Sequence, residues 1–247
     1  MPLLQKLDQF HLSIRSNRWH SYFYLFCRLS LALGFVIAGM VKILGERFAS
    51  GLSEIHPMGT YLVALYHTGF YYPMIGVAQV IAAVLLLLHR TTLLGAIIYF
   101  PIILNIWMLS IAVRFDGSYV SSTLMVLANL YLLAYNYDRW KIILAGKKSG
   151  NFSVLEVSAK NSKFPLGFLG FVTGCIISVI VVFQFAYEVM PKNSHSECLT
   201  QFDESELGQI GKEFCECVHR IGKPLDQCLE NFELSKKLIR SNPDSST

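Results

Sequence analysis

Long apolar runs alternate with short polar links along the first 190 residues of the chain. Five runs have about the 20 residues that a helix needs to cross a hydrocarbon core. The pattern therefore predicts membrane-spanning helices at 22–44, 70–88, 92–113, 119–137 and 166–189. The run at 58–66 is too short to span, and it predicts a surface or re-entrant helix.

The first twenty residues are polar and amphipathic, and a run long enough to span the membrane follows them. A cleavable signal peptide would instead have a short apolar core near its start. We expect residues 1–20 to form an interfacial helix that lies on the membrane.

A different periodicity begins after residue 190. Apolar residues recur at three- and four-residue steps over 207–221 and again over 225–239, which predicts two helices that each bury one face. Gly222 ends the first pattern and Pro224 suits the start of the second, so the two helices form a hairpin that turns at Gly222–Lys223.

Four cysteines lie in this hairpin region, and three pairings are possible. Cys217 and Cys228 lie on the inward faces on either side of the turn, which favours the pair Cys217–Cys228. Cys215 then lies on the other side of its helix and pairs with Cys198. A redox-active Cys-x-Cys and a metal site are alternatives, but the spacing is not that of a common zinc site. We favour structural disulfides, because a hairpin this small needs covalent support.

The amino-acid composition indicates the class of protein. Hydrophobic residues make up 53% of the chain and charged residues 15%, whereas a soluble domain carries roughly 25% charge. The net charge of +4 comes from loops between apolar runs, so nucleic-acid binding is a poor interpretation. The sequence predicts an all-α membrane protein with these parts: an interfacial segment (1–20), a four-helix membrane domain (21–140), a basic linker (141–164), a fifth span (165–190) and a cysteine-rich hairpin (191–247).

The basic residues also predict an orientation. They gather at the N-terminus, after the second span and after the fourth, and the cytoplasmic side of a membrane attracts such residues. The N-terminus is therefore expected in the cytoplasm and the hairpin outside it. Disulfides persist in extracytoplasmic space, which favours the same side. We expect the bacterial cytoplasmic (inner) membrane, with a periplasmic hairpin.

Two cations lie inside the first span. Arg28 and Lys42 are fourteen residues apart and so within about 40° of each other around a helix, with Glu46 on the same stripe. Lys42 can serve a binding site, or it can extend its amine to the interface because it is two residues from the predicted span end.

Single amides mark the next three spans: Gln79, Asn105 and Asn129. We expect them to face one another across the bundle. Hydrogen bonding between helices is favoured over a pocket for a small molecule. A ridge of small residues in the fifth span (Gly170, Gly174 and Ser178) suits close helix packing, either within the bundle or between protomers.

More polar residues gather at the expected outer ends of the spans, and they form no known nucleophile, phosphate-binding or metal motif. They are Glu46, Arg47, His56, His67, Arg114 and Asp116. We therefore predict no catalytic residues and no metal ligands.

Residues 22–140 resemble the DoxX/DoxD-like family of small four-helix membrane proteins. The resemblance rests on RLSLALGFVIAGMVKIL, where Arg28, Gly34, Gly39 and Lys42 match the family pattern, and on GVAQVIAAVLLLLHRTTLLGA. The family usually has Glu where this chain has Gln79, which removes a titratable group. The resemblance implies a four-helix bundle and an association with membrane oxidoreductase systems, some of them linked to quinones.

Two functions from different classes follow. In the first, the chain is a subunit of a redox-linked membrane complex that binds a quinone or another small lipid-soluble molecule near Lys42, Gln79, Asn105 and Arg28. In the second, it is a non-catalytic adaptor, and its hairpin (191–247) binds an extracytoplasmic protein.

Overall fold

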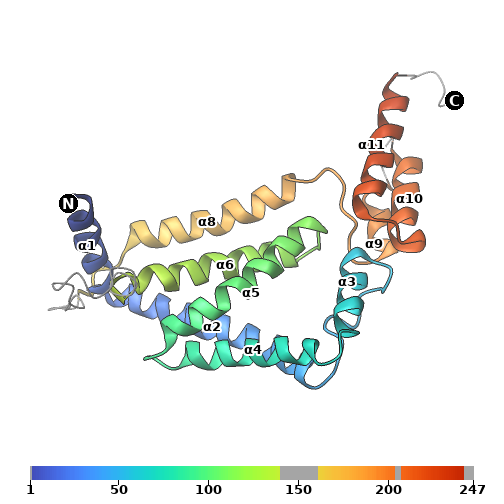
Figure 1. The fold of residues 1–247 in the computed structure, drawn as a ribbon. Helices are drawn as coiled ribbons and strands as arrows, with labels where there is room; N and C mark the ends of the chain where they lie inside the picture. Colours follow the sequence, from blue (N-terminus) through green and yellow to red (C-terminus); the bar gives the residue numbers. More distant parts are fainter. Residues whose placement is uncertain (1, 140–160, 204–206, 242–247) are drawn as a thin grey trace.

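The computed structural model describes residues 2–139, 161–203 and 207–241, and these ranges contain helices and no strand (Figure 1). The helices are α1 (Pro2–Arg15), α2 (Arg18–Ile43), α3 (Pro57–Tyr66), α4 (Tyr71–Leu87), α5 (Thr92–Ala112), α6 (Ser118–Tyr135), α8 (Leu166–Phe185), α9 (His195–Thr200), α10 (Gly208–Glu216), the π-helical turn η1 (Cys217–Ile221) and α11 (Leu225–Ser241). The predicted all-α class is confirmed. Helices α2, α4, α5, α6 and α8 correspond to the five predicted spans, and both ends of each helix lie within four residues of the predicted ends.

Helices α2, α4, α5 and α6 pack side by side into a bundle, and α8 lies along α6 (Figure 1). The core of the bundle is apolar, and at its centre the rings of Phe35 and Tyr99 stack with centroids 3.6 Å apart. The buried small residues Ala82, Ala83 and Ala96 let the helices approach closely around this stack.

The tightest contact in the bundle joins α2 and α4. A methyl group added to Gly39 would lie 2.7 Å from the carbonyl oxygen of Gly76, and one added to Gly76 would lie 2.6 Å from the carbonyl oxygen of Gly39. Such distances are below van der Waals contact, so the two backbones touch here and only glycine fits on either side.

Four described helices, α2, α5, α6 and α8, are each long and apolar enough to cross a membrane. Helix α4 has 17 residues and reaches a sufficient length only together with α3, to which it is bent by 98°. The short helix predicted at 58–66 is present as α3. That α4 forms a fifth membrane crossing stays a prediction.

Helix α8 is the most loosely packed of the long helices. It buries none of its residues. Phe168 contacts the rings of His20, Phe23 and Tyr131, and Phe183 contacts Tyr119. A methyl group added to Gly170 or Gly174 would meet no atom within 4 Å, so the small-residue ridge does not pack within the bundle.

The C-terminal helices α9, α10, η1 and α11 form a separate small core around Phe214, Val218 and Phe232. Disulfides join Cys198 to Cys215 and Cys217 to Cys228, the same pairs that the sequence favours. The predicted turn is confirmed, because Gly222 follows η1 with a φ of 71° and α11 begins at Leu225. We refer to α10, η1 and α11 as the hairpin.

The hairpin and α3 lie at one end of the bundle, and α1 lies at the other (Figure 1). We call these the hairpin end and the α1 end. Within the segment expected at 1–20, a helix is present as α1, and α2 begins at Arg18; the position of α1 on a membrane surface stays a prediction. Residues 141–160 of the basic linker predicted at 141–164 lie outside the described residues, as does residue 140.

The contact between α2 and α4 predicts that Gly39→Leu lowers the free energy of unfolding by about 1–3 kcal/mol, because the new side chain forces two helix backbones apart. Thermal unfolding in detergent micelles measures this. Gly170→Leu is the matched control, since the same side chain on α8 enters open space. An equal loss of stability in both variants would contradict the close contact.

Candidate functional site

Arg28 lies in α2 near the α1 end of the bundle and is buried. Its Nε donates to the carbonyl oxygen of Leu86 at 2.8 Å, and its Nη2 donates to that of Leu87 at 2.8 Å. The last carbonyls of a helix have no partner within the helix and carry partial negative charge. Arg28 therefore caps the C-terminus of α4, about 21 Å along α2 from Lys42.

Lys42 is buried in the last turn of α2, at the hairpin end. Its Nζ donates to the carbonyl oxygen of Ala38 at 2.9 Å and lies 4.5 Å from the centre of the Phe48 ring. The expectation that Glu46 continues the helical stripe of Arg28 and Lys42 is wrong, because α2 ends at Ile43 and Glu46 lies beyond the helix. Lys42 thus neither pairs with Glu46 nor extends to solvent.

The three amides do not converge. Gln79 is 1% exposed, its Oε1 has no hydrogen-bond partner, and its Cβ lies beside Gly39 at the contact of α2 and α4. Asn129 donates to the carbonyl oxygen of Ala96 at 3.1 Å. Asn105 is exposed on the outer surface of α5, so the expectation that it faces Gln79 across the core is wrong. The periodicity of α5 is too weak to reveal this, because its lipid-facing and inward-facing residues are both apolar.

Three of the polar residues predicted at the outer ends, Arg114, Asp116 and His56, instead join the bundle to the C-terminal part of the chain. The Nη1 of Arg114 donates to the carbonyl oxygen of Val189 at 2.8 Å, and its guanidinium lies 4.4 Å from the Tyr187 ring. Asp116 forms an ion pair with Lys192 at 3.0 Å. The segment 187–192 is therefore fastened to the loop between α5 and α6.

His56 makes a second connection, from the loop before α3. It is completely buried, its Nδ1 accepts from the backbone N–H of Met58, and its Nε2 lies 2.9 Å from the carbonyl oxygen of Lys192. These contacts require a neutral imidazole that carries its proton on Nε2. The ring of His219 in η1 lies 5.6 Å from that of His56.

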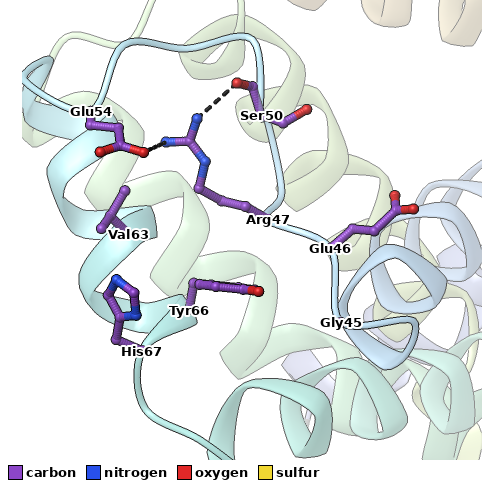
Figure 2. A pocket seen from close by; sticks show the side chains of 8 residues that line it. All are labelled: Gly45, Glu46, Arg47, Ser50, Glu54, Val63, Tyr66 and His67. Atoms are coloured by element: carbon purple, nitrogen blue, oxygen red, sulfur yellow. Dashed lines mark hydrogen bonds and ion pairs between the residues drawn. The ribbon is translucent and has the colours of Figure 1, made fainter.

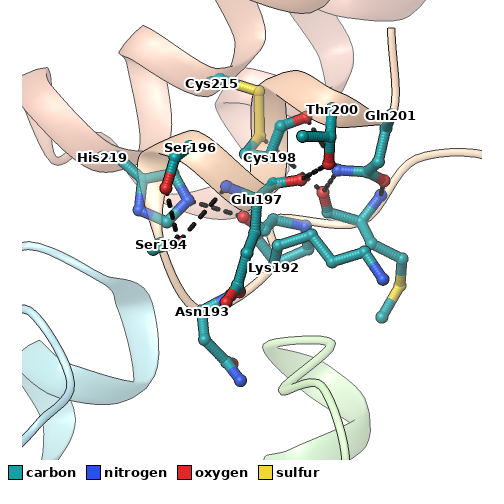
Figure 3. Close-up of a disulfide and its surroundings, with 12 residues drawn as sticks. Lys192, Asn193, Ser194, Ser196, Glu197, Cys198, Thr200, Gln201, Cys215 and His219 are labelled. Atoms are coloured by element: carbon teal, nitrogen blue, oxygen red, sulfur yellow. Dashed lines mark hydrogen bonds between the residues drawn. A yellow bond between two sulfur atoms is a disulfide. The ribbon is translucent and has the colours of Figure 1, made fainter. Parts of the chain in front are cut away.

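His219 and the Cys198–Cys215 disulfide lie at the junction on the hairpin side (Figure 3). His219 Nε2 lies 2.6 Å from the carbonyl oxygen of Pro191, directly before the residue that His56 contacts. A methyl group on Gly222 would lie 2.9 Å from the Ile55 side chain, so the hairpin turn rests on the loop before α3. Neither Ile55 nor the segment 187–192 carries a sequence signal for this role.

At the four cysteines, the structure has neither the redox-active Cys-x-Cys nor the metal site that the sequence left as alternatives. Cys215 and Cys217 are each bonded to a different partner and not to each other, so neither is a free thiol. Among the described residues, no cluster of three or more His, Cys, Asp or Glu side chains has a geometry that could hold a metal ion.

No protein-family model matches this chain, and no solved structure matches it. The uncharacterized protein YwoB of Bacillus subtilis is 34% identical over 110 residues, which cover 42% of this chain and 71% of YwoB.

The chain belongs to the same family as YwoB. The name of YwoB states no activity, substrate or partner, so membership in the YwoB family brings no function to this chain. The match covers less than half of the chain.

The junction predicts a pH dependence. Burial, together with the neighbouring His219, lowers the pKa of His56 from 6.5 to about 4, and burial lowers the pKa of His219. We call the junction docked when these contacts are formed. Between about pH 4 and pH 6.5, the undocked state therefore binds more protons than the docked state. Stability of the junction is fully present above pH 6.5 and falls as the pH drops toward 4.

Hydrogen exchange of the peptides covering 53–58 and 189–193, corrected for the intrinsic pH effect, measures this. We expect faster exchange at pH 5 than at pH 7.5. His56→Gln should loosen the junction by about 1–2 kcal/mol at pH 7.5 and weaken its pH dependence, because one titrating group and one hydrogen bond are lost. His89→Gln, at an exposed site at the α1 end, is the control. Exchange independent of pH in the unaltered protein would contradict the role of the imidazoles.

Proposed function

We propose that this protein is a membrane adaptor that holds a disulfide-bonded hairpin at a fixed position on one membrane surface, where the hairpin binds a partner protein. One observation carries the proposal: Arg114, Asp116 and His56 fasten the segment leading to the hairpin onto the bundle. A flexible tether would need no such contacts, whereas a surface presented in a fixed orientation lowers the entropic cost of binding.

The bundle in this proposal is DoxX-like and crosses the bacterial cytoplasmic membrane five times, with α4 counted as a span. The N-terminus lies in the cytoplasm and the hairpin lies outside. Two observations support this orientation. Helix α1 and the hairpin lie at opposite ends of the bundle, and two disulfides join cysteines of α9 and the hairpin. Such bonds persist outside the cytosol and rarely within it.

The partner surface is a groove between α10 and α11 with a volume of about 380 Å³. Its floor includes the buried Phe214 and Phe232, and the exposed apolar side chains Ile221, Leu234 and Leu238 line it. Residues 189–247 contain ten acidic and seven basic residues. We propose that the groove binds an apolar helix of the partner protein flanked by basic residues.

The double variant Leu234→Glu/Leu238→Glu tests the adaptor function. Both side chains are exposed, so the charges should leave the fold intact and abolish partner binding. The full chain is affinity-purified from its native membranes, and mass spectrometry identifies the partner that co-purifies in a fixed ratio. Reconstitution with that partner then measures binding. Gln227→Glu adds one negative charge on α11 outside the groove, against two in the double variant, and should keep the partner.

Two outcomes would contradict the adaptor function. If the same partner binds the double variant unchanged, the groove is not the docking surface. If the only complex is a dimer of this chain that the double variant disrupts, the groove serves self-association. The open ridge of Gly170, Gly174 and Ser178 on α8 offers a separate place for oligomerisation, which the double variant leaves intact.

A quinone-binding subunit of a redox-linked complex is the second candidate, and the unpaired Oε1 of Gln79 favours it. A buried amide oxygen without a partner costs free energy, and a donor on a ligand can satisfy it. Asn105 lies outside such a site, and Arg28 lies at the α1 end, so the site reduces to Gln79 and Lys42.

Native mass spectrometry of the purified protein tests this candidate. Gln79→Leu should remove a bound quinone, while Asn129→Leu, which also removes a buried amide with an unpaired oxygen, should keep it. An unaltered protein without bound quinone, or equal quinone content in both variants, would eliminate the second candidate.

A further inference from the structure

An open cleft lies at the hairpin end between the loop 45–54 and α3, and the function proposed above does not use it (Figure 2). Its volume is about 420 Å³. The lining residues are Gly45, Glu46, Arg47, Ser50, Glu54, Val63, Tyr66 and His67. Charged and aromatic side chains predominate, which distinguishes the cleft from the apolar groove of the hairpin.

The loop that forms one wall of the cleft is held in place. The buried Tyr72 of α4 donates its hydroxyl to the carbonyl oxygen of Glu46 at 2.9 Å and accepts from the backbone N–H of Phe48 at 2.8 Å. Arg47 Nη2 donates to the carbonyl oxygens of Ser50 at 2.7 Å and Leu52 at 3.1 Å. The cleft is therefore formed before any ligand arrives.

Arg47 provides an unused cationic donor. Its side chain is 17% exposed, and its Nη1 is shielded from solvent without a hydrogen-bond partner. The nearest carboxylate, that of Glu54, is 3.9 Å from Nη1 and its side chain is 73% exposed. Because the Glu54 carboxylate is largely exposed and lies near the outer limit of an ion pair, an anionic group can displace it from Arg47 at small cost.

The displaced Glu54 stays at the edge of the cleft, where its carboxylate can bind an ammonium group. A ligand with a phosphate beside Arg47 and an ammonium beside Glu54 therefore matches both charges. Because Arg47 Nη2 already donates to two loop carbonyls, the phosphate receives a single charge-assisted hydrogen bond from Nη1. The charges of these two neighbouring side chains are complementary to those of phosphoethanolamine.

The surroundings of the cleft indicate a lipid as the source of this group. Leu44, directly before the cleft, is 68% exposed, and Phe70, shortly after His67, is 82% exposed. Exposed apolar side chains at the ends of α2 and α4 suit contact with acyl chains, and polar headgroups lie at this depth. We propose that the cleft binds the phosphoethanolamine headgroup of a membrane lipid through Arg47 and Glu54.

The test uses the full chain in detergent and native mass spectrometry with three added lipids that share the same acyl chains: phosphatidylethanolamine, phosphatidylglycerol and phosphatidylcholine. We expect retention of phosphatidylethanolamine to exceed that of both others by about tenfold, the size of one charge-assisted hydrogen bond. Free phosphoethanolamine at millimolar concentration is the second arm. Displacement of the lipid by it supports the same headgroup chemistry from a soluble source.

Two variants make the test specific. Glu54→Gln should abolish the preference for phosphatidylethanolamine over phosphatidylglycerol, because it removes the ammonium partner and keeps Arg47. Asp226→Asn removes an exposed carboxylate from α11 and should keep the preference. Arg47→Met should lower retention of both phosphatidylethanolamine and phosphatidylglycerol. Since this change can loosen the loop, the Glu54 variant decides.

Equal retention of the three lipids by the unaltered protein would overturn the proposal, as would an unchanged preference in Glu54→Gln. The adaptor function is independent of these outcomes, because the hairpin groove shares no residue with the cleft.

Discussion

The contact between Gly39 and Gly76 is the constraint on which the arrangement of the hairpin end depends. Because the backbones of α2 and α4 touch there, the next residues of both helices come close together. Tyr72, one turn before Gly76, can then hold the loop that follows α2. This one close approach determines the loop wall of the cleft, the position of Phe48 and the enclosure of Lys42.

The same contact gives a physical reason for the glycine-x-x-lysine pattern in the first span. Gly39 is needed because any side chain would meet α4. Lys42 lies one turn further, buried between Ala38 and Phe48, where its amine has a carbonyl and an aromatic ring as neighbours. Both residues of the pattern therefore have structural roles, and a ligand is not required to explain them.

The helices, the hairpin turn and the cysteine pairs could be predicted from the sequence because each leaves a local signal. Apolar runs of sufficient length give the long helices, Gly222 ends the first hairpin helix, and the spacing of Cys217 and Cys228 around it gives their pairing. The roles of Arg28 and Asn105 could not be predicted. In a membrane helix the inward-facing and lipid-facing residues are both apolar, so a single polar residue does not reveal its direction. The docking of the hairpin depends on backbone carbonyls of Val189, Pro191 and Lys192, which any sequence can supply.

The central claim is that the hairpin is held on the bundle, and a photoreactive residue at Ile55 tests it most directly. The Ile55 side chain borders Gly222 in the hairpin turn. Irradiation of native membranes at neutral pH should link position 55 to the peptide that contains Gly222 within the same chain. A photoreactive residue at Tyr61, on α3, should form no such link. Absence of the intramolecular link at position 55 would contradict the docked arrangement.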